Sequence, residues 1–262
     1  MESERAYLLD NAQPEAGARF GALAELFDPS TFRHFEALGI GPGMRCWEVG
    51  AGGPSVPGWL AARVGPEGHV LATDLDVSWL PTDAGYDVRR HDVGVEAAPG
   101  GDFHLVHARL LLVHVNNRAA ALAAMVGALR PGGVLLVEEA DPALQPLACP
   151  DESGAAQRLA NKLKHDFRAL MAERGVDLAY GRKLPRLLRG AGLRDVAADA
   201  YFPVTGPACA RLERATIEQI RGRLLDAGLA TRAEIDEHLA NLDAGELDVA
   251  TSPMISAWGI KR

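Results

Sequence analysis

Segments of helical periodicity alternate with short apolar runs along most of this chain. Apolar residues spaced by three or four positions predict a helix over 16–27. A second helix is expected to begin at Asp28, with Asp28 as its N-cap and Pro29 in its first turn, and to end at Gly39. The chain is therefore expected to open with an N-terminal helical segment ahead of its first strand.

Strands and helices then alternate as far as residue 140. Five apolar runs predict strands, at 44–49, 68–76, 86–92, 102–108 and 134–140. A helix is expected after the first strand, and another, capped by Asn117, before the fifth. Regular strand–helix–strand alternation predicts an α/β fold, a doubly wound and mostly parallel sheet with right-handed crossovers.

The pattern changes after Asp141. Helices are expected at 153–173, 184–191, 208–226 and 231–242, the last with a capping box formed by Thr231 and Glu234. Strands are expected from about 192 to 204 and near the end of the chain. The added helices fit either a lid over an active site or ordinary structural insertions.

Composition narrows the class of protein. The 262 residues are 48% apolar and 24% charged, enough for a large α/β domain with a proper core. With 35 acidic and 27 basic side chains, the net charge of −8 disfavours a nucleic acid or an anionic membrane as partner. Three separated cysteines indicate neither a disulfide framework nor zinc, and the first residues lack a signal-peptide pattern, so a cytoplasmic protein is expected.

Candidate chemistry begins with "WEVGAGGPSVPGWL", residues 47–60, which should connect the first strand to its helix. Gly50, Gly52 and Gly53 lack the Cβ atoms that would keep a ligand away from the backbone. Asp74 ends the next strand, where a carboxylate can accept hydrogen bonds from ribose hydroxyls. These features together indicate an adenosine-containing ligand at the carboxyl edge of the sheet.

Two classes of cofactor remain to be separated. A dinucleotide loop needs a third glycine where this chain has Ser55, and Pro54 and Pro57 remove N–H donors. Glu48 places a negative charge just before the loop, which would face phosphates unfavourably but suits an ammonium group. An adenosine joined to a cationic amino acid is S-adenosyl-L-methionine (SAM), so SAM is favoured over NAD.

Five segments, in this order, resemble class I SAM-dependent methyltransferases, most closely the UbiE-like small-molecule type: "WEVGAGG", "TDLD", "HDV", "FHLVHARLLLVHV" and "LRPGGVLLVEE". The resemblance implies a Rossmann-like methyltransferase fold with a seven-stranded sheet, in which "MISAWGI" forms an antiparallel strand between the fifth and sixth. It also implies an N-terminal helical segment at 1–39 and a SAM-binding domain at 40–262. Helical insertions at about 143–180 and 207–247 would form the lid.

The resemblance also implies roles for individual residues. The expected contacts are Glu48, Gly50, Ala51 and Gly52 with the methionine part of SAM, Asp74 with ribose, Leu75 with the adenine face, Asp92 and Val93 with the adenine amine, and Ala108 and Arg109 beside the sulfonium. Each carboxylate has a plainer alternative. Asp74 could only terminate a strand, Glu48 could form an ion pair at the sheet edge, and Asp92 could belong to a simple loop.

Catalytic residues are less constrained, because alignment alone supplies much of the rate of methyl transfer. His114 is the first choice for a general base, against a packing role at a helix start. His107 could contact the cofactor or orient Arg109, whereas His165 is expected in solvent. Further candidates are Asp166 and Arg109, for substrate binding or ion pairs, and Tyr7, closing over the cofactor. No cluster has metal-ligand spacing.

The sequence thus predicts SAM-dependent methyl transfer to an oxygen or nitrogen of a small organic molecule, such as a quinone, a polyketide or another secondary metabolite. A SAM-binding protein that does not methylate, as a regulator or scaffold, remains an alternative. An NAD-dependent oxidoreductase and an RNA or protein methyltransferase are less favoured. The acceptor and the oligomeric state stay open, a homodimer being one option.

Overall fold

The computed structural model describes residues 15–81 and 83–262. The chain divides into two compact units, each built from separate segments. The sheet unit comprises residues 27–140, 180–201 and 254–262, and the helical unit comprises residues 15–26, 141–179 and 202–253. The predicted helical insertions fall mainly in the helical unit, whereas the strands of the sheet all lie in the sheet unit.

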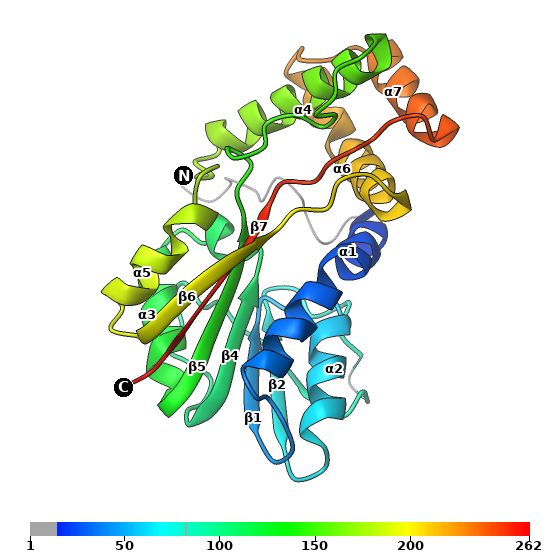
Figure 1. Cartoon of the computed structure of the whole chain (residues 1–262). Coiled ribbons are helices and arrows are strands. Elements are labelled where there is room, and N and C mark those ends of the chain that lie inside the picture. Colours follow the sequence, from blue (N-terminus) through cyan, green and yellow to red (C-terminus); the bar gives the residue numbers. More distant parts are fainter. Residues whose placement is uncertain (1–14, 82) are drawn as a thin grey trace. The chain divides into compact units, whose positions relative to one another are not determined.

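The sheet unit contains a seven-stranded sheet in the order β3-β2-β1-β4-β5-β7-β6 (Figure 1). The strands are β1 (Arg45–Val49), β2 (His69–Asp74), β3 (Asp87–Arg90), β4 (Phe103–Arg109), β5 (Leu129–Ala140), β6 (Arg194–Tyr201) and β7 (Met254–Ile260). The first five pair in parallel, and β7 runs antiparallel to both neighbours, β5 and β6. The predicted fold class and the position of the last strand are both confirmed.

Helices cover the sheet through apolar faces. The helices and short 3₁₀ turns of this unit are α2 (Ser55–Val64), η1 (Leu112–His114), α3 (Arg118–Ala128), η2 (Gly181–Lys183) and α5 (Leu184–Gly190). Asn117 caps α3 as predicted, its side chain accepting a hydrogen bond from the Ala120 N–H. On the face covered by α2, Leu60 packs in one core with Cys46, Leu105 and Leu136.

The first helix differs from the prediction. One continuous helix, α1 (Glu15–Ala37), runs through Pro29 instead of breaking at Asp28. Asp28 is not a cap, because its carboxylate pairs with Arg109 at the end of β4, 2.8 Å away. Proline in a helix interior costs several kcal/mol, so packing and ion pairing outweigh the local signal here. The half of α1 from Phe27 onward belongs to the sheet unit, where Phe35 joins the core.

The helical unit packs α4 (Ala155–Glu173), α6 (Pro207–Asp226) and α7 (Arg232–Ala244) around its own apolar core. Leu163, Ile220 and Ile235 are enclosed in that core. The predicted capping box of α7 is present, with the Thr231 side chain accepting from the Glu234 N–H and the Glu234 carboxylate accepting from the Thr231 N–H. Across the two described stretches, no helix is long and apolar enough to cross a membrane.

Candidate functional site

The glycine loop leaves β1 at the carboxyl edge of the sheet. Gly50 and Gly52 have φ of 67° and 62°, a region that glycine enters without strain. The N–H groups of Gly50 and Ala51 both donate to the carbonyl oxygen of Thr73, at 2.8 and 3.0 Å. These bonds fix the loop against the end of β2 and turn its backbone toward the edge of the sheet.

Asp74 ends β2 directly beside that loop. Its carboxylate accepts hydrogen bonds from the Gly52 N–H at 2.9 Å and from the Asp76 N–H at 3.1 Å. Burial raises the pKa of Asp74, and these backbone bonds oppose the rise. The structure therefore brings together the glycine loop and the carboxylate that the sequence pairs with it.

Beside Asp74, Leu75 is 57% exposed, so its apolar surface is open to solvent at the end of β2. Asp92 follows β3, and its carboxylate accepts from the Gly94 N–H at 2.8 Å in a local turn. Val93 is buried in that turn. Leu75 directly follows β2, and Asp92 and Val93 follow β3. The two strands pair in parallel, so their ends are neighbours at the carboxyl edge of the sheet.

A buried ionic network lies on the sheet face covered by α1. Glu48 in β1 contacts His107 Nδ1 in β4 at 2.6 Å, and His107 Nε2 lies 3.2 Å from Glu138 in β5. All three side chains are at most 2% exposed. Burial lowers the pKa of His107, but the two carboxylates outweigh it and raise that pKa to about 9, so the imidazole is held as a cation. The ion pair considered for Glu48 is thus present.

Side chains from α1 and β7 complete this network. Thr31 donates to Glu138 at 2.5 Å, and Ser256 donates to the other oxygen of the same carboxylate at 2.6 Å. Arg109 donates to the Thr31 hydroxyl at 3.0 Å and pairs with Asp28. Burial opposes ionisation of Glu138, yet His107, Arg109 and Ser256 lower its pKa to about 2. Arg109 therefore ties β4 to α1, and Ala108 beside it is buried.

Glu139, on the opposite face of β5, holds the turn that follows β4. Its carboxylate accepts from the Leu112 N–H at 2.5 Å. Arg118 stabilises the same turn by donating to the carbonyl oxygens of Leu112 and Val113, at 3.1 and 2.9 Å. Burial raises the pKa of Glu139 to about 8, although the backbone bonds and Arg118 oppose the rise.

This clamped turn carries Leu111, which contacts the glycine loop, and His114. The Leu111 side chain lies over Gly50 so closely that a Cβ there would be 2.7 Å from Leu111 Cδ1. His114 ends the turn, partly exposed, with its N–H donating to the Leu111 carbonyl at 2.9 Å. His114 is thus positioned by a turn that β4, β5 and α3 fix together.

The remaining candidates lie elsewhere. His165 is exposed on α4, as expected, and Asp166 pairs with Lys162 at 3.3 Å, both within the helical unit. Tyr7 lies outside the described residues. Among residues 15–81 and 83–262, no group of three or more His, Cys, Asp or Glu side chains is placed to hold a metal ion.

Sequence reasoning missed Glu138, Glu139 and the part played by α1. The available signal was the pair of acids that ends the otherwise apolar run of β5, because carboxylates in a strand covered on both faces need partners. Those partners are distant in sequence. Thr31 and Glu138 are 107 positions apart, and Ser256 and Glu138 are 118 apart.

Known proteins resemble this chain along most of its length. A family model described as a methyltransferase domain matches residues 15–198. The ubiquinone/menaquinone biosynthesis C-methyltransferase UbiE of Bordetella avium is 29% identical over 160 residues, covering 56% of this chain and 62% of that protein. A phosphoethanolamine N-methyltransferase of Triticum aestivum is 22% identical over 178 residues, covering 65% of this chain and 32% of that protein.

Solved structures share the fold. Phosphoethanolamine N-methyltransferase 2 of Haemonchus contortus, in complex with S-adenosyl-L-methionine, has a TM-score of 0.56 at 14% identity, covering 94% of this chain and 56% of that one. A SAM-dependent methyltransferase from Aquifex aeolicus has a TM-score of 0.52 at 12% identity, covering 95% and 100%. The chain thus spans less than two thirds of the curated relatives named above.

Proposed function

Since the chain belongs to the methyltransferase domain family of class I SAM-dependent methyltransferases, we propose that it transfers the methyl group of SAM to a small organic acceptor. The observation that carries this proposal is the meeting, at one sheet edge, of the glycine loop, the Asp74 carboxylate bonded to it, and the exposed Leu75. None of these three features alone distinguishes a ligand site from a structural turn.

The residues at this edge fit SAM. The loop backbone takes positive φ angles at Gly50 and Gly52, and in this proposal it contacts the methionine part, while Asp74 provides acceptors for ribose. Leu75 offers an apolar surface for the adenine ring, with Asp92 and Val93 at its amine. Ala108 and Arg109 end β4, and in this proposal they lie beside the sulfonium. When bound, SAM supplies an electrophilic methyl group.

Direct contact between Glu48 and the ammonium group of SAM stays a prediction. Glu48 is 2% exposed and paired with His107, beneath the loop. Burial raises the pKa of Glu48, and the charge and hydrogen bond of His107 oppose the rise. The cation His107 holds the carboxylate in place. In this proposal the network positions the end of β1, and the loop backbone makes the contacts.

The chain's own contribution to the reaction is alignment. Glu139 and Arg118 fix the turn after β4, so that Leu111 and His114 keep their places relative to the glycine loop. His114 is the proposed general base, which accepts the acceptor's proton where the acceptor must lose one. An acceptor that needs no deprotonation would depend on alignment alone.

For the atom that is methylated, we favour oxygen or nitrogen. Similarity to a phosphoethanolamine N-methyltransferase supports a nitrogen acceptor. Similarity to UbiE, named as a C-methyltransferase, supports a carbon acceptor as the second candidate. Both relatives are only partly covered by this chain, so the acceptor class has to be measured.

The test is turnover. The purified protein is incubated with SAM carrying a ¹³C-labelled methyl group and a panel of phenols, quinols, amines and activated methylene compounds, and S-adenosylhomocysteine is quantified. The carbon shift of the product methyl group separates O-, N- and C-methylation. SAM binding without turnover on any acceptor class would instead favour a non-methylating SAM-binding protein.

A further inference from the structure

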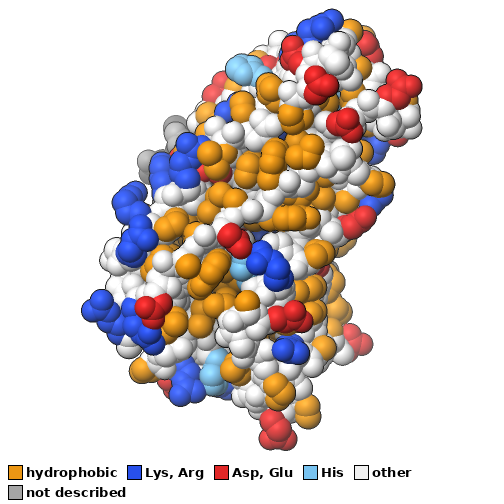
Figure 2. Space-filling model, in the orientation of Figure 1, with side chains coloured by type: hydrophobic (Ala, Val, Ile, Leu, Met, Phe, Trp, Pro, Cys, Tyr) orange, Lys and Arg blue, Asp and Glu red, His pale blue; other side chains and the backbone are white. Residues whose placement is uncertain are grey.

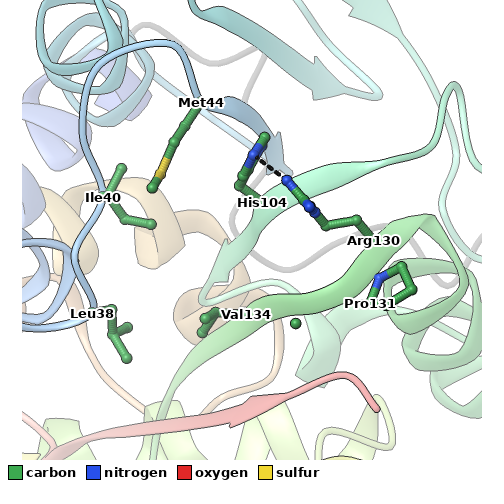
Figure 3. A pocket seen from close by; sticks show the side chains of 8 residues that line it. Leu38, Ile40, Met44, His104, Arg130, Pro131 and Val134 are labelled. Carbon is green, nitrogen blue, oxygen red and sulfur yellow. Dashed lines mark hydrogen bonds between the residues drawn. The ribbon is translucent and has the colours of Figure 1, made fainter.

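A cavity of about 280 Å³ lies at the amino edge of the sheet, the edge opposite the glycine loop (Figure 3). Its apolar walls are Leu38 and Ile40 after α1, Met44 before β1, and Val134 in β5. His104, near the start of β4, and Arg130, in β5, form its polar side. We call this cavity the amino-edge pocket.

The polar side has more hydrogen-bond donors than acceptors. The Arg45 N–H points to His104 Nδ1 at 3.1 Å, and Arg130 Nη1 lies 2.8 Å from His104 Nε2. A neutral imidazole carries a proton on one of its two nitrogens, so only one nitrogen can accept. In either tautomer, a donor from Arg45 or Arg130 therefore faces an imidazole N–H.

Protonation does not relieve this conflict. An imidazolium would point an N–H at both donors and add a charge beside Arg130. Burial, followed by the charges of Arg130 and Arg45, lowers the pKa of His104, which keeps the ring neutral. A group that only accepts hydrogen bonds and carries negative charge would satisfy both Arg130 and the imidazole N–H.

The surroundings favour such a group. Among the described residues that line the pocket, none is acidic. Two more basic side chains bond to backbone that lines or adjoins the pocket. Arg63 donates to the Ile40 carbonyl at 2.9 Å, and Lys261 donates to the Leu129 carbonyl at 2.5 Å. In Figure 2, His, Lys or Arg, and Asp or Glu side chains all lie among hydrophobic ones at the lower end of the sheet unit.

We propose that the amino-edge pocket binds a small amphipathic carboxylate. The carboxylate accepts hydrogen bonds from Arg130 and His104, and its apolar body rests on Ile40, Met44 and Val134. A planar carboxylate matches the fork of a guanidinium group. The volume has room for roughly nine atoms of water size, which corresponds to a short-chain fatty acid.

This site is separate from the proposed SAM site. A strand rises about 3.3 Å per residue, so His104 and Arg109 are about 16 Å apart along β4. A carboxylate in the amino-edge pocket would therefore not compete with a ligand at the glycine loop. The two sites can be measured independently.

Hexanoate is the probe, with hexanamide as its uncharged match. Titration of the full chain is followed by calorimetry and by the ring signals of His104, assigned with His104→Gln. We expect saturable hexanoate binding, a rise in the pKa of His104 on binding, and no binding of hexanamide. Arg130→Met should weaken binding at least about tenfold, because it removes charge-assisted hydrogen bonds. Arg89→Met, an exposed arginine in β3, is the matched control and should change nothing.

The outcomes are distinguishable. Hexanoate binding that is equal in Arg130→Met and the unmodified chain, or no saturable binding at millimolar concentrations, would overturn the proposal. Acetate binding as tightly as hexanoate would refute the role of the apolar walls. Hexanoate that displaces SAM, or that loses affinity in the presence of SAM, would place it at the glycine loop instead.

Discussion

Glu138 and Glu139 are neighbours in β5 and both are enclosed, yet their pKa values move in opposite directions. Glu138 faces α1, where His107, Arg109 and Ser256 outweigh burial and lower its pKa to about 2. Glu139 faces the turn after β4, where burial raises its pKa to about 8. Successive strand residues point to opposite faces. The same strand therefore carries the ionised Glu138 on one face of the sheet and the largely protonated Glu139 on the other.

Glu139→Gln should change how stability depends on pH. The folded pKa of about 8 lies above the unfolded value, so this carboxyl contributes stability that is fully present below about 4.3 and lost as the pH rises through about 8. The variant, which cannot titrate there, should remove a slope of up to about 1.4 kcal/mol per pH unit between these limits. Urea unfolding at about pH 5, 6.5 and 8.5 measures the free energy of unfolding within this range and just above it. Identical slopes in both proteins would refute the assignment.

His107→Gln should destabilise the protein strongly near neutral pH. Removing the cation leaves Glu48 and Glu138 buried without their partner, which costs about 3–5 kcal/mol. The raised pKa of about 9 means that this contribution is fully present below about 6.5 and disappears as the pH rises through 9.

A second histidine in the sheet unit provides the control. His69 pairs with Asp87 at 3.0 Å, but the two side chains are 34% and 73% exposed. His69→Gln should therefore cost only about 0–1 kcal/mol. Similar free energies of unfolding for the two variants would mean that the buried network contributes no more than a surface pair.

Gly50→Ala should weaken SAM binding and stability together. Alanine at φ 67° is strained, and its Cβ would meet Leu111 at 2.7 Å, so about 1–2 kcal/mol of stability should be lost. Gly58→Ala is the matched control eight positions on, within α2, where a Cβ meets nothing within 4 Å. That variant should gain about 0.5–1 kcal/mol and bind SAM normally. Calorimetry with SAM reads the affinity, and unaltered binding in Gly50→Ala would contradict the loop assignment.

Arg118→Met should lower kcat while leaving SAM affinity nearly unchanged. The substitution removes both donors to the turn that carries His114, and loss of alignment should reduce kcat by about 10–100-fold. Arg63→Met, which likewise removes a donor to a backbone carbonyl, acts at the Ile40 oxygen of the opposite edge. Only Arg118→Met should affect turnover; a loss confined to SAM binding would instead connect the turn with the cofactor.

Local patterns were sufficient to predict the strands and the mostly parallel, doubly wound sheet. The resemblance carried by the five motifs implied the antiparallel β7 between β5 and β6, which the sheet shows, and the family, which the domain match confirms. The path of α1 through Pro29 was not predictable in this way, because Arg109, 81 positions after Asp28, provides the partner that replaces capping. Likewise, the state of Glu138 depends on Thr31 and Ser256, which no local window contains. Assignments that rest on a ligand, such as Asp74 with ribose, stay predictions.

The most direct test of the account is calorimetric titration of the protein with SAM and with NAD⁺, repeated for Asp74→Ala and for Asp76→Ala. Asp76 is the control because its carboxylate accepts hydrogen bonds from Ser78 in its own turn, the N–H at 3.0 Å. We expect SAM to bind and NAD⁺ not to bind. Asp74→Ala, but not Asp76→Ala, should weaken SAM binding at least about tenfold, because hydrogen bonds to a charged group are lost. Binding of NAD⁺, or unchanged SAM affinity in Asp74→Ala, would contradict the assignment of this sheet edge as a SAM site.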